Sequence, residues 1–133
     1  VWDDAWAAKE GVERADVDRI CREADFITLH TVLTDETRNL INAERLATMK
    51  KTAVIINTAR GGLIDETALL AALQQGSIYG AGLDVFEQEP PANPAWYELD
   101  NLVMGSHCSS STAGATETMG NMAVDNLLRD LGI

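Results

Sequence analysis

The chain has 133 residues, of which 46% are hydrophobic, enough to bury one core, and this composition argues against disorder. Its 21 acidic and 10 basic residues give a formal net charge of −11. Such a charge repels phosphate backbones and anionic lipids, so neither nucleic acid nor a membrane surface is expected as a partner.

The first half of the chain alternates short helical segments with short apolar strands. Each strand is too short for a helix and is apolar on both faces, which is typical of central strands in a parallel sheet. Asparagine and aspartate stand where helix N-caps are needed. The predicted elements are a helix over 3–10 closed by Gly11, a helix over 17–23 after Asp16, a strand over 26–29, a helix from the cap Asn42 to Met49, and a strand over 53–56.

The second half continues this alternation, which predicts a doubly wound parallel α/β sheet of the Rossmann type. Beyond Ala113, apolar residues recur with helical spacing, and we expect this stripe to belong to the core. The predicted elements are a helix capped by Asp65 and ended by Gly76, a strand over 78–83, a strand over 102–104, and a helix from Ala113 that carries Met119, Met122, Ala123, Leu127 and Leu131.

Ionisable residues follow all four predicted strands. His30 follows the first, Arg60 the second, Asp84 the third and His107 the fourth. Because the carboxyl ends of parallel strands lie at one edge of a sheet, these side chains are expected to share that edge, where ligands bind. Glu89, a few residues beyond Asp84, is expected to join them.

These residue types suit acid–base chemistry on a small carboxylic acid. A histidine works best near neutral pH when a carboxylate holds its second ring nitrogen, and Glu89 could hold His107 in this way. Arg60 precedes a glycine pair, and a guanidinium can bind a carboxylate through two hydrogen bonds. A 2-oxo or 2-hydroxy acid would fit such a site, which would then need a hydride partner.

Three segments, NTARGGLIDETALLAAL, GAGLDVFEQEPP and the loop around His107, resemble cofactor-domain motifs of the D-isomer-specific 2-hydroxyacid dehydrogenases. The likeness is greatest to the phosphoglycerate dehydrogenase branch of that family and covers nearly the whole chain. It implies an oxidoreductase that transfers a hydride between a D-2-hydroxy acid and nicotinamide. The cofactor implied is NAD, with NADP not excluded, and 3-phosphoglycerate is one candidate substrate.

The resemblance also implies roles for individual residues. Arg60 would bind the substrate carboxylate, His107 would move the hydroxyl proton, and Glu89 would support the histidine. Asp84 would accept a hydrogen bond from the nicotinamide carboxamide. The residues implied to border the cofactor are Thr31, Thr58, Ala59, Arg60, Asp84, His107, Ser109 and Ser110.

Parts of the family pattern are absent from residues 1–133. No GxGxxG segment follows a strand, and no substrate domain is recognisable, so the chain corresponds to a dinucleotide-binding domain that is incomplete at its N-terminus. We expect the isolated chain to be inactive, and the resemblance implies a homodimer for the intact enzyme. Val32 and Ser106 stand where many relatives have proline, so we expect these loops to be less rigid than in those relatives.

Other interpretations are weaker but distinct. A catalytically silent NAD-binding regulatory protein of the same fold is the main alternative, and a flavodoxin-like binding domain leaves the strand-end residues unexplained. His30 is expected to be a loop or packing residue, and the serines after His107 suit a helix cap better than a phosphate site.

No metal site is expected, because the two histidines lack ligand spacing. Cys21 and Cys108 lack CxxC spacing, so reduced thiols and a cytoplasmic location are expected.

Overall fold

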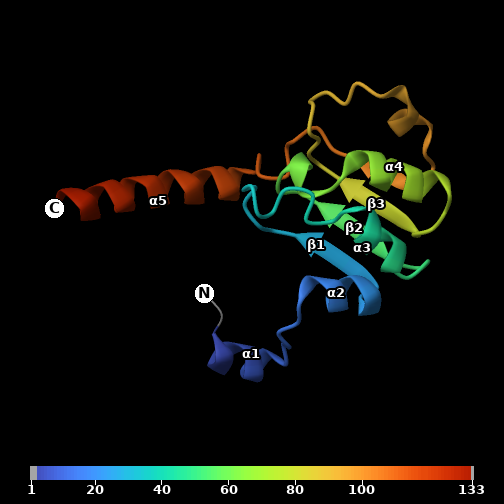
Figure 1. Ribbon diagram of the computed structural model, residues 1–133. Coiled ribbons are helices and arrows are strands. Elements are labelled where there is room, and N and C mark those ends of the chain that lie inside the picture. Colours follow the sequence, from blue (N-terminus) through green and yellow to red (C-terminus); the bar gives the residue numbers. More distant parts are fainter. Residues whose placement is uncertain (1–2, 133) are drawn as a thin grey trace.

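A computed structural model describes residues 3–132 and contains one sheet of four parallel strands in the order β1-β2-β3-β4 (Figure 1). Its register places Ile27, Ile55 and Ala81 side by side on neighbouring strands. The predicted Rossmann-like α/β fold is confirmed. The elements are α1 (Asp4–Glu10), α2 (Val17–Glu23), β1 (Phe26–Leu29), α3 (Ala43–Thr48), β2 (Val54–Asn57), η1 (Gly61–Leu63), α4 (Glu66–Gln74), β3 (Gly80–Leu83), η2 (Pro94–Glu98), β4 (Leu102–Met104) and α5 (Ala113–Leu131).

The predicted helix starts are confirmed by their caps. The side chains of Asp3, Asp16, Asn42 and Asp65 each accept a hydrogen bond from a backbone amide in the first turn of the helix that follows. Such bonds satisfy amides that have no partner within the helix. Two strand boundaries differ from prediction: the second strand begins one residue later, at Val54, and the third is confined to Gly80–Leu83.

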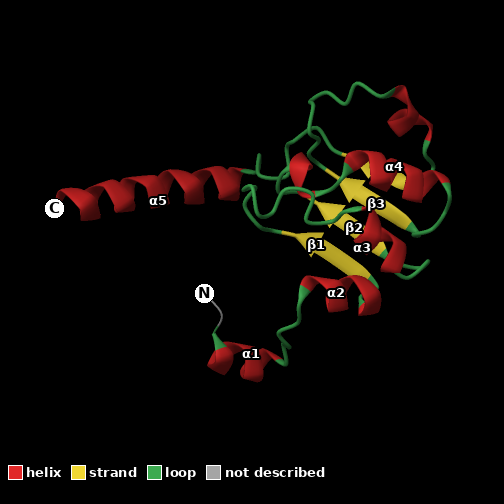
Figure 2. Ribbon diagram, in the orientation of Figure 1, coloured by secondary structure: helices red, strands yellow, loops and turns green. Residues whose placement is uncertain are grey.

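The helices α2, α3 and α4 form one layer against one face of the sheet (Figure 2). Right-handed crossovers that always step in the same direction place every connecting helix on the same face. The core lies between these layers and includes Cys21 from α2, Leu46 from α3 and Leu69 from α4. Ile27 and Ile55 supply this core from the sheet.

Apolar residues on both faces predicted central strands over 26–29 and 53–56. This holds for β2, but β1 lies at an edge of the sheet and one of its faces is exposed. On the face opposite the helix layer, Phe26 and Val103 are 74% and 75% exposed, whereas Ile27 on the covered face is 6% exposed. The physical reason is the strand order, because same-direction crossovers bring no connecting helix within residues 3–132 to the second face.

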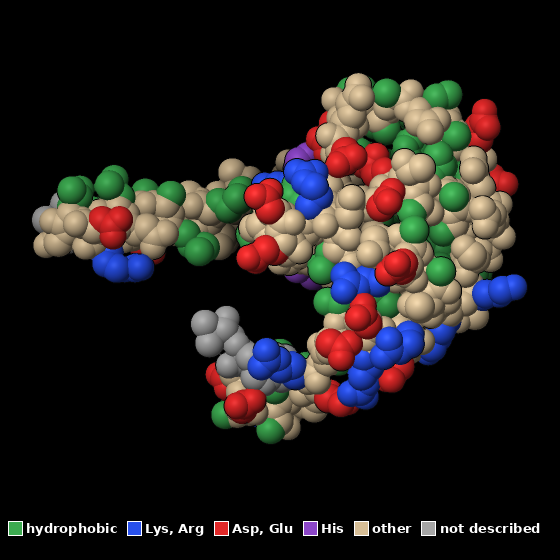
Figure 3. All heavy atoms as spheres, in the orientation of Figure 1, with side chains coloured by type: hydrophobic (Ala, Val, Ile, Leu, Met, Phe, Trp, Pro, Cys, Tyr) green, Lys and Arg blue, Asp and Glu red, His purple; other side chains and the backbone are tan. Residues whose placement is uncertain are grey.

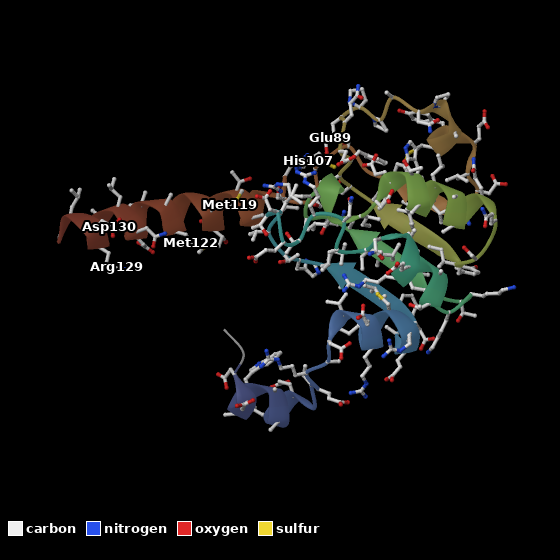
Figure 4. All side chains as sticks on the ribbon, viewed as in Figure 1. Glu89, His107, Met119, Met122, Arg129 and Asp130 are labelled. Carbon is white, nitrogen blue, oxygen red and sulfur yellow. The ribbon has the colours of Figure 1, made fainter. Side chains whose placement is uncertain are left out.

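The prediction that the apolar stripe of the last helix is core was also wrong. Helix α5 extends away from the sheet as an arm and contains no buried residue among those described (Figure 1). Met119 and Met122 are more than half exposed, and Figure 4 shows them along the arm, away from the strands. Helical spacing identified an apolar face correctly, but the helix does not pack on this sheet. None of the described helices is both long and apolar enough to cross a membrane.

Candidate active site

The strand-end residues lie at the carboxyl edge of the sheet, as predicted. His30 directly follows β1, Arg60 lies just beyond β2, Asp84 directly follows β3, and His107 lies just beyond β4. Figure 3 shows histidine and charged side chains gathered where the arm α5 leaves the domain. The topology therefore concentrates this chain's ionisable strand-end groups on one rim.

The structure joins His107 to Glu89. The Nδ1 atom of His107 lies 2.7 Å from Oε2 of Glu89, and Figure 4 shows the two residues side by side. The other carboxylate oxygen of Glu89 accepts a hydrogen bond from the Phe86 amide at 3.0 Å. The bond from His107, and then that from Phe86, hold the pKa of Glu89 below its usual range. A carboxylate at Nδ1 leaves Nε2 of the imidazole as the atom that can exchange a proton with a ligand.

Asp84 positions the loop that carries His107. Its Oδ1 accepts a hydrogen bond from the Cys108 amide at 3.1 Å, and its Oδ2 accepts one from the Ser109 amide at 2.8 Å. Bonds from the hydroxyl and then the amide of Ser109 hold the pKa of Asp84 below its usual range. His107 itself has a left-handed backbone with φ of 58°, a conformation that costs energy unless the surroundings impose it. The buried carboxylate of Asp84 is one element of those surroundings.

Gly105 makes this arrangement possible. A Cβ atom built on Gly105 would lie 2.1 Å from Oδ1 of Asp84, far inside contact distance. A glycine at this position therefore lets the loop after β4 pass directly over the aspartate. The sequence alone does not reveal this requirement, because it depends on the distance between two segments that are separate along the chain.

A cavity of about 290 Å³ lies beside the histidine. Its wall includes the ring of Phe86, which packs edge-to-face on the buried Trp96 with ring centroids 5.7 Å apart. This aromatic support fixes one wall of the cavity. The residues that line it are Asp84, Phe86, Glu89, Pro90, Pro91, Tyr97, Met104, Gly105, Ser106 and His107.

Arg60 lines a separate hollow of about 630 Å³, together with His30, Thr31 and Ala59 among others. Its side chain is exposed, and its Nη1 donates to the carbonyl of Ala59 at 2.6 Å. The turn is shaped by the buried Asn57, whose Nδ2 donates to the Arg60 carbonyl at 2.9 Å and whose Oδ1 accepts from the Ala59 amide at 3.0 Å. The sequence signal for Asn57, which was not among the predicted site residues, is a polar residue at the end of an apolar strand.

The predicted site residues thus fall into two neighbouring groups. Glu89 and His107 are in contact, whereas Arg60 does not line their cavity. Phe86 connects the two groups, because it also lines a third hollow that includes Arg60. The common rim predicted from the sequence is therefore present, but the described residues do not form one cavity that Arg60, Glu89 and His107 all line.

The remaining predicted residues occupy varied positions. Thr58 is half-buried in the turn before Arg60, and Ser110 is exposed in the loop after His107. The ring of His30 hydrogen-bonds the hydroxyl of Thr28, with Nε2 and Oγ1 2.9 Å apart. Thr112 caps α5 by accepting a hydrogen bond from the Ala115 amide, consistent with the capping role favoured for this polar run.

The hollow beside Arg60 can accept one end of a dinucleotide. Its volume lies within the range of about 300–1,000 Å³ that is usual for small-molecule sites. It lies at the carboxyl edge of a parallel sheet, where such folds bind their ligands. Thr31, Ala59 and Arg60, three of the residues implied to border the cofactor, line it.

Comparisons with known proteins agree with this geometry. Residues 3–109 match the family described as D-isomer specific 2-hydroxyacid dehydrogenase, NAD binding domain. The chain is 46% identical to a hydroxypyruvate reductase of Thermotoga maritima, with 92% of this chain and 41% of the relative aligned. It is also 46% identical to a D-3-phosphoglycerate dehydrogenase of Methanocaldococcus jannaschii, with 94% and 24% aligned.

Among solved structures, the chain is similar to a D-isomer specific 2-hydroxyacid dehydrogenase from Lactobacillus delbrueckii ssp. bulgaricus in its NAD-complexed form. The TM-score is 0.85 at 31% identity, over 99% of this chain and 44% of the other. The chain therefore spans less than half the length of each of these relatives. The matched region corresponds to the NAD-binding domain of that family. On this sequence match and this fold, the chain belongs to the D-isomer-specific 2-hydroxyacid dehydrogenase family.

Proposed function

We propose that this domain serves an enzyme that interconverts a D-2-hydroxy acid and the corresponding 2-oxo acid. The observation that carries the proposal is the 2.7 Å contact between Glu89 and His107 beside a cavity, on the rim that also presents Arg60. When bound, NAD accepts or supplies the hydride at C2 of the substrate. Because the chain spans less than half of its relatives' length, we assign this activity to a longer protein that contains it.

The acid–base step belongs to His107. During reduction, its Nε2 would donate a proton to the oxygen on C2, and during oxidation it would remove the hydroxyl proton. Glu89 stabilises the charged imidazole through the bond at Nδ1 and fixes the orientation of the ring.

Binding of the substrate carboxylate belongs to Arg60. Its exposed guanidinium can form two parallel hydrogen bonds to a carboxylate, which would orient C2 next to the cofactor. Asp84 would accept a hydrogen bond from the carboxamide of the cofactor. Its oxygens already accept two backbone amides, but each carboxylate oxygen has a further lone pair.

We propose a small 2-oxo acid as the substrate class. The similar proteins are named for hydroxypyruvate, glyoxylate and D-3-phosphoglycerate. In all three compounds the carboxylate is bonded to C2, the carbon that is oxidised or reduced. Phosphoglycerate chemistry remains one specific candidate within this class.

A catalytically silent NAD-binding regulatory protein is the alternative function. It would use the hollow beside Arg60 but has no use for a carboxylate held at Nδ1 of a histidine. The Glu89–His107 contact therefore favours the enzyme.

The test is NADH oxidation by the full-length protein with hydroxypyruvate, 3-phosphohydroxypyruvate, glyoxylate and pyruvate. His107→Ala should lower kcat by about 100-fold to 10,000-fold, the usual contribution of a general acid–base group. Arg60→Ala should raise KM and lower kcat together, because the carboxylate is bound in both ground and transition states. Lys51→Ala, on the exposed turn before β2, is the matched control. Turnover by none of the four acids, or equally small effects of both site variants, would contradict the proposal.

A further inference from the structure

The loop that carries Glu89 is held by a second glutamate from another element. Glu66, the first residue of α4, accepts a hydrogen bond through Oε1 from the Glu87 amide at 2.5 Å. The preceding amide, that of Phe86, donates to Glu89 itself. Two consecutive amides of this loop are therefore bound by two different carboxylates.

The peptide group between Phe86 and Glu87 is also packed closely against the backbone of Gly61. A Cβ atom built on Gly61 would lie 2.0 Å from the carbonyl carbon of Phe86 and 2.2 Å from the Glu87 nitrogen. Gly61 directly follows Arg60, and Glu66 begins the helix after this turn. The segment that presents the guanidinium thus contacts one peptide group twice, once by close backbone packing and once by a hydrogen bond.

The charges around Glu66 are unfavourable for a carboxylate. Burial raises the pKa of Glu66, the Glu87 amide lowers it, and the nearby carboxylates of Glu87 and Glu89 raise it. The Nη1 atom of Arg38 lies 3.3 Å from Oε1 of Glu87 and offsets part of the negative charge of Glu87. Electrostatic repulsion disfavours a third carboxylate beside Glu87 and Glu89. The favourable interaction that Glu66 makes here is its hydrogen bond from the Glu87 amide.

We propose that Glu66 is a positioning residue that orients Glu89 toward His107 by fixing the Phe86–Glu87 peptide group. The Phe86 N–H belongs to the adjoining Val85–Phe86 peptide group, so a fixed Phe86–Glu87 peptide restricts its direction from the next residue. The Phe86 N–H then holds one oxygen of Glu89, and the other oxygen is directed to Nδ1 of the histidine. The same contact ties the acid–base pair to the turn that carries Arg60. The catalytic consequence rests on the proposed function, but the orientation of Glu89 does not.

The test compares Glu66→Ala with Glu66→Gln. Both substitutions remove the charge, but glutamine keeps an oxygen that can accept the Glu87 amide. The readout is the titration of the Glu89 carboxyl carbon, followed by ¹³C NMR in this chain. In Glu66→Ala the pKa of Glu89 should rise toward its usual value, because its bonds from His107 and Phe86 weaken. In Glu66→Gln it should stay at or below the wild-type value, because the bond to the loop is kept and one nearby negative charge is removed. Identical titration of Glu89 in the two variants would overturn the proposal.

A measurement on the unmodified chain protects the test against misfolding of Glu66→Ala. The Glu87 amide should exchange with solvent more slowly than the amide of Gln88, for which the described residues provide no hydrogen-bond partner. Equal exchange of the two amides would overturn the proposal without any variant.

Turnover of the full-length protein tests the catalytic consequence of this positioning role. Glu66→Ala should lower kcat about 10-fold to 100-fold, as misplacement of a catalytic group does, and Glu66→Gln should restore most of it. If no 2-oxo acid is turned over, the proposed function fails, while the titration of Glu89 still decides the role of Glu66. If turnover occurs and glutamine fails to rescue it, the positioning role is contradicted.

Discussion

The two sides of the rim differ in how their charged groups are satisfied. On the β3–β4 side, Asp84 and Glu89 accept hydrogen bonds from backbone amides, and Glu89 also holds His107. On the β1–β2 side, Arg60 is exposed, and its guanidinium donates a hydrogen bond to the carbonyl of the neighbouring Ala59. The acid–base side is thus organised by the fold itself, whereas the guanidinium keeps most of its donors for a ligand.

This contrast predicts the largest loss of stability from Gly105→Ala. The new Cβ would meet Oδ1 of Asp84 at 2.1 Å and force the two loops apart, so we expect a cost of about 3 kcal/mol, the upper part of the range for overpacking. Gly82→Ala is the control, since its Cβ would lie 3.8 Å from Ile56 in ordinary contact. Urea unfolding measures both. A Gly105→Ala protein as stable as Gly82→Ala would show that the acid–base side is not rigidly organised.

A smaller loss is expected from Asp84→Asn, with a defined pH dependence. The side-chain amide nitrogen cannot accept the Ser109 amide, and the lost charge weakens the remaining bond, so we expect a cost of about 1–2 kcal/mol at pH 7. Because the folded state lowers the pKa of Asp84 below 3.8, its stabilisation is complete above that value and is lost as pH falls through the lower folded-state pKa.

The difference in unfolding free energy between the wild type and Asp84→Asn should therefore shrink as the pH falls below about 4. Urea unfolding over a pH series measures it. A difference that stays constant or grows in acid would contradict the assigned role of the Asp84 charge.

The smallest effect on stability is expected on the other side of the rim. Arg60→Ala should change the free energy of unfolding by no more than about 0.5 kcal/mol, because the side chain is exposed and bonds an adjacent carbonyl. The same variant should lose most substrate binding in the full-length protein. A large loss of stability in thermal unfolding would mean that Arg60 is a structural residue, and the contrast between the two sides would fail.

The sequence predicted the rim because each apolar strand ends at a polar or ionisable residue, and parallel strands bring those ends together. It could not predict the groups that hold the rim in place. Glu66 and Gly105 act on segments that are distant along the chain, and their contacts depend on the folded chain. Local pattern carries no information on such distances.

The two apolar helix stripes make the same point. Leu69 and Leu73 in α4 have the spacing of a buried face and are buried, whereas Met119 and Met122 in α5 have a similar spacing and are exposed. Periodicity indicates which face of a helix is apolar, but not which surface covers it. The burial of the α4 stripe comes from the crossover that returns this helix to the sheet.

The most direct test of the account is the tautomer of the neutral His107 ring, observed by long-range ¹H–¹⁵N NMR of the imidazole. A carboxylate at Nδ1 predicts that the proton of the neutral ring stays on Nδ1 and that Nε2 is free, and that Glu89→Ala abolishes this preference. If the proton of the wild-type ring lies mainly on Nε2, Glu89 does not hold the histidine, and the proposed acid–base pair is contradicted.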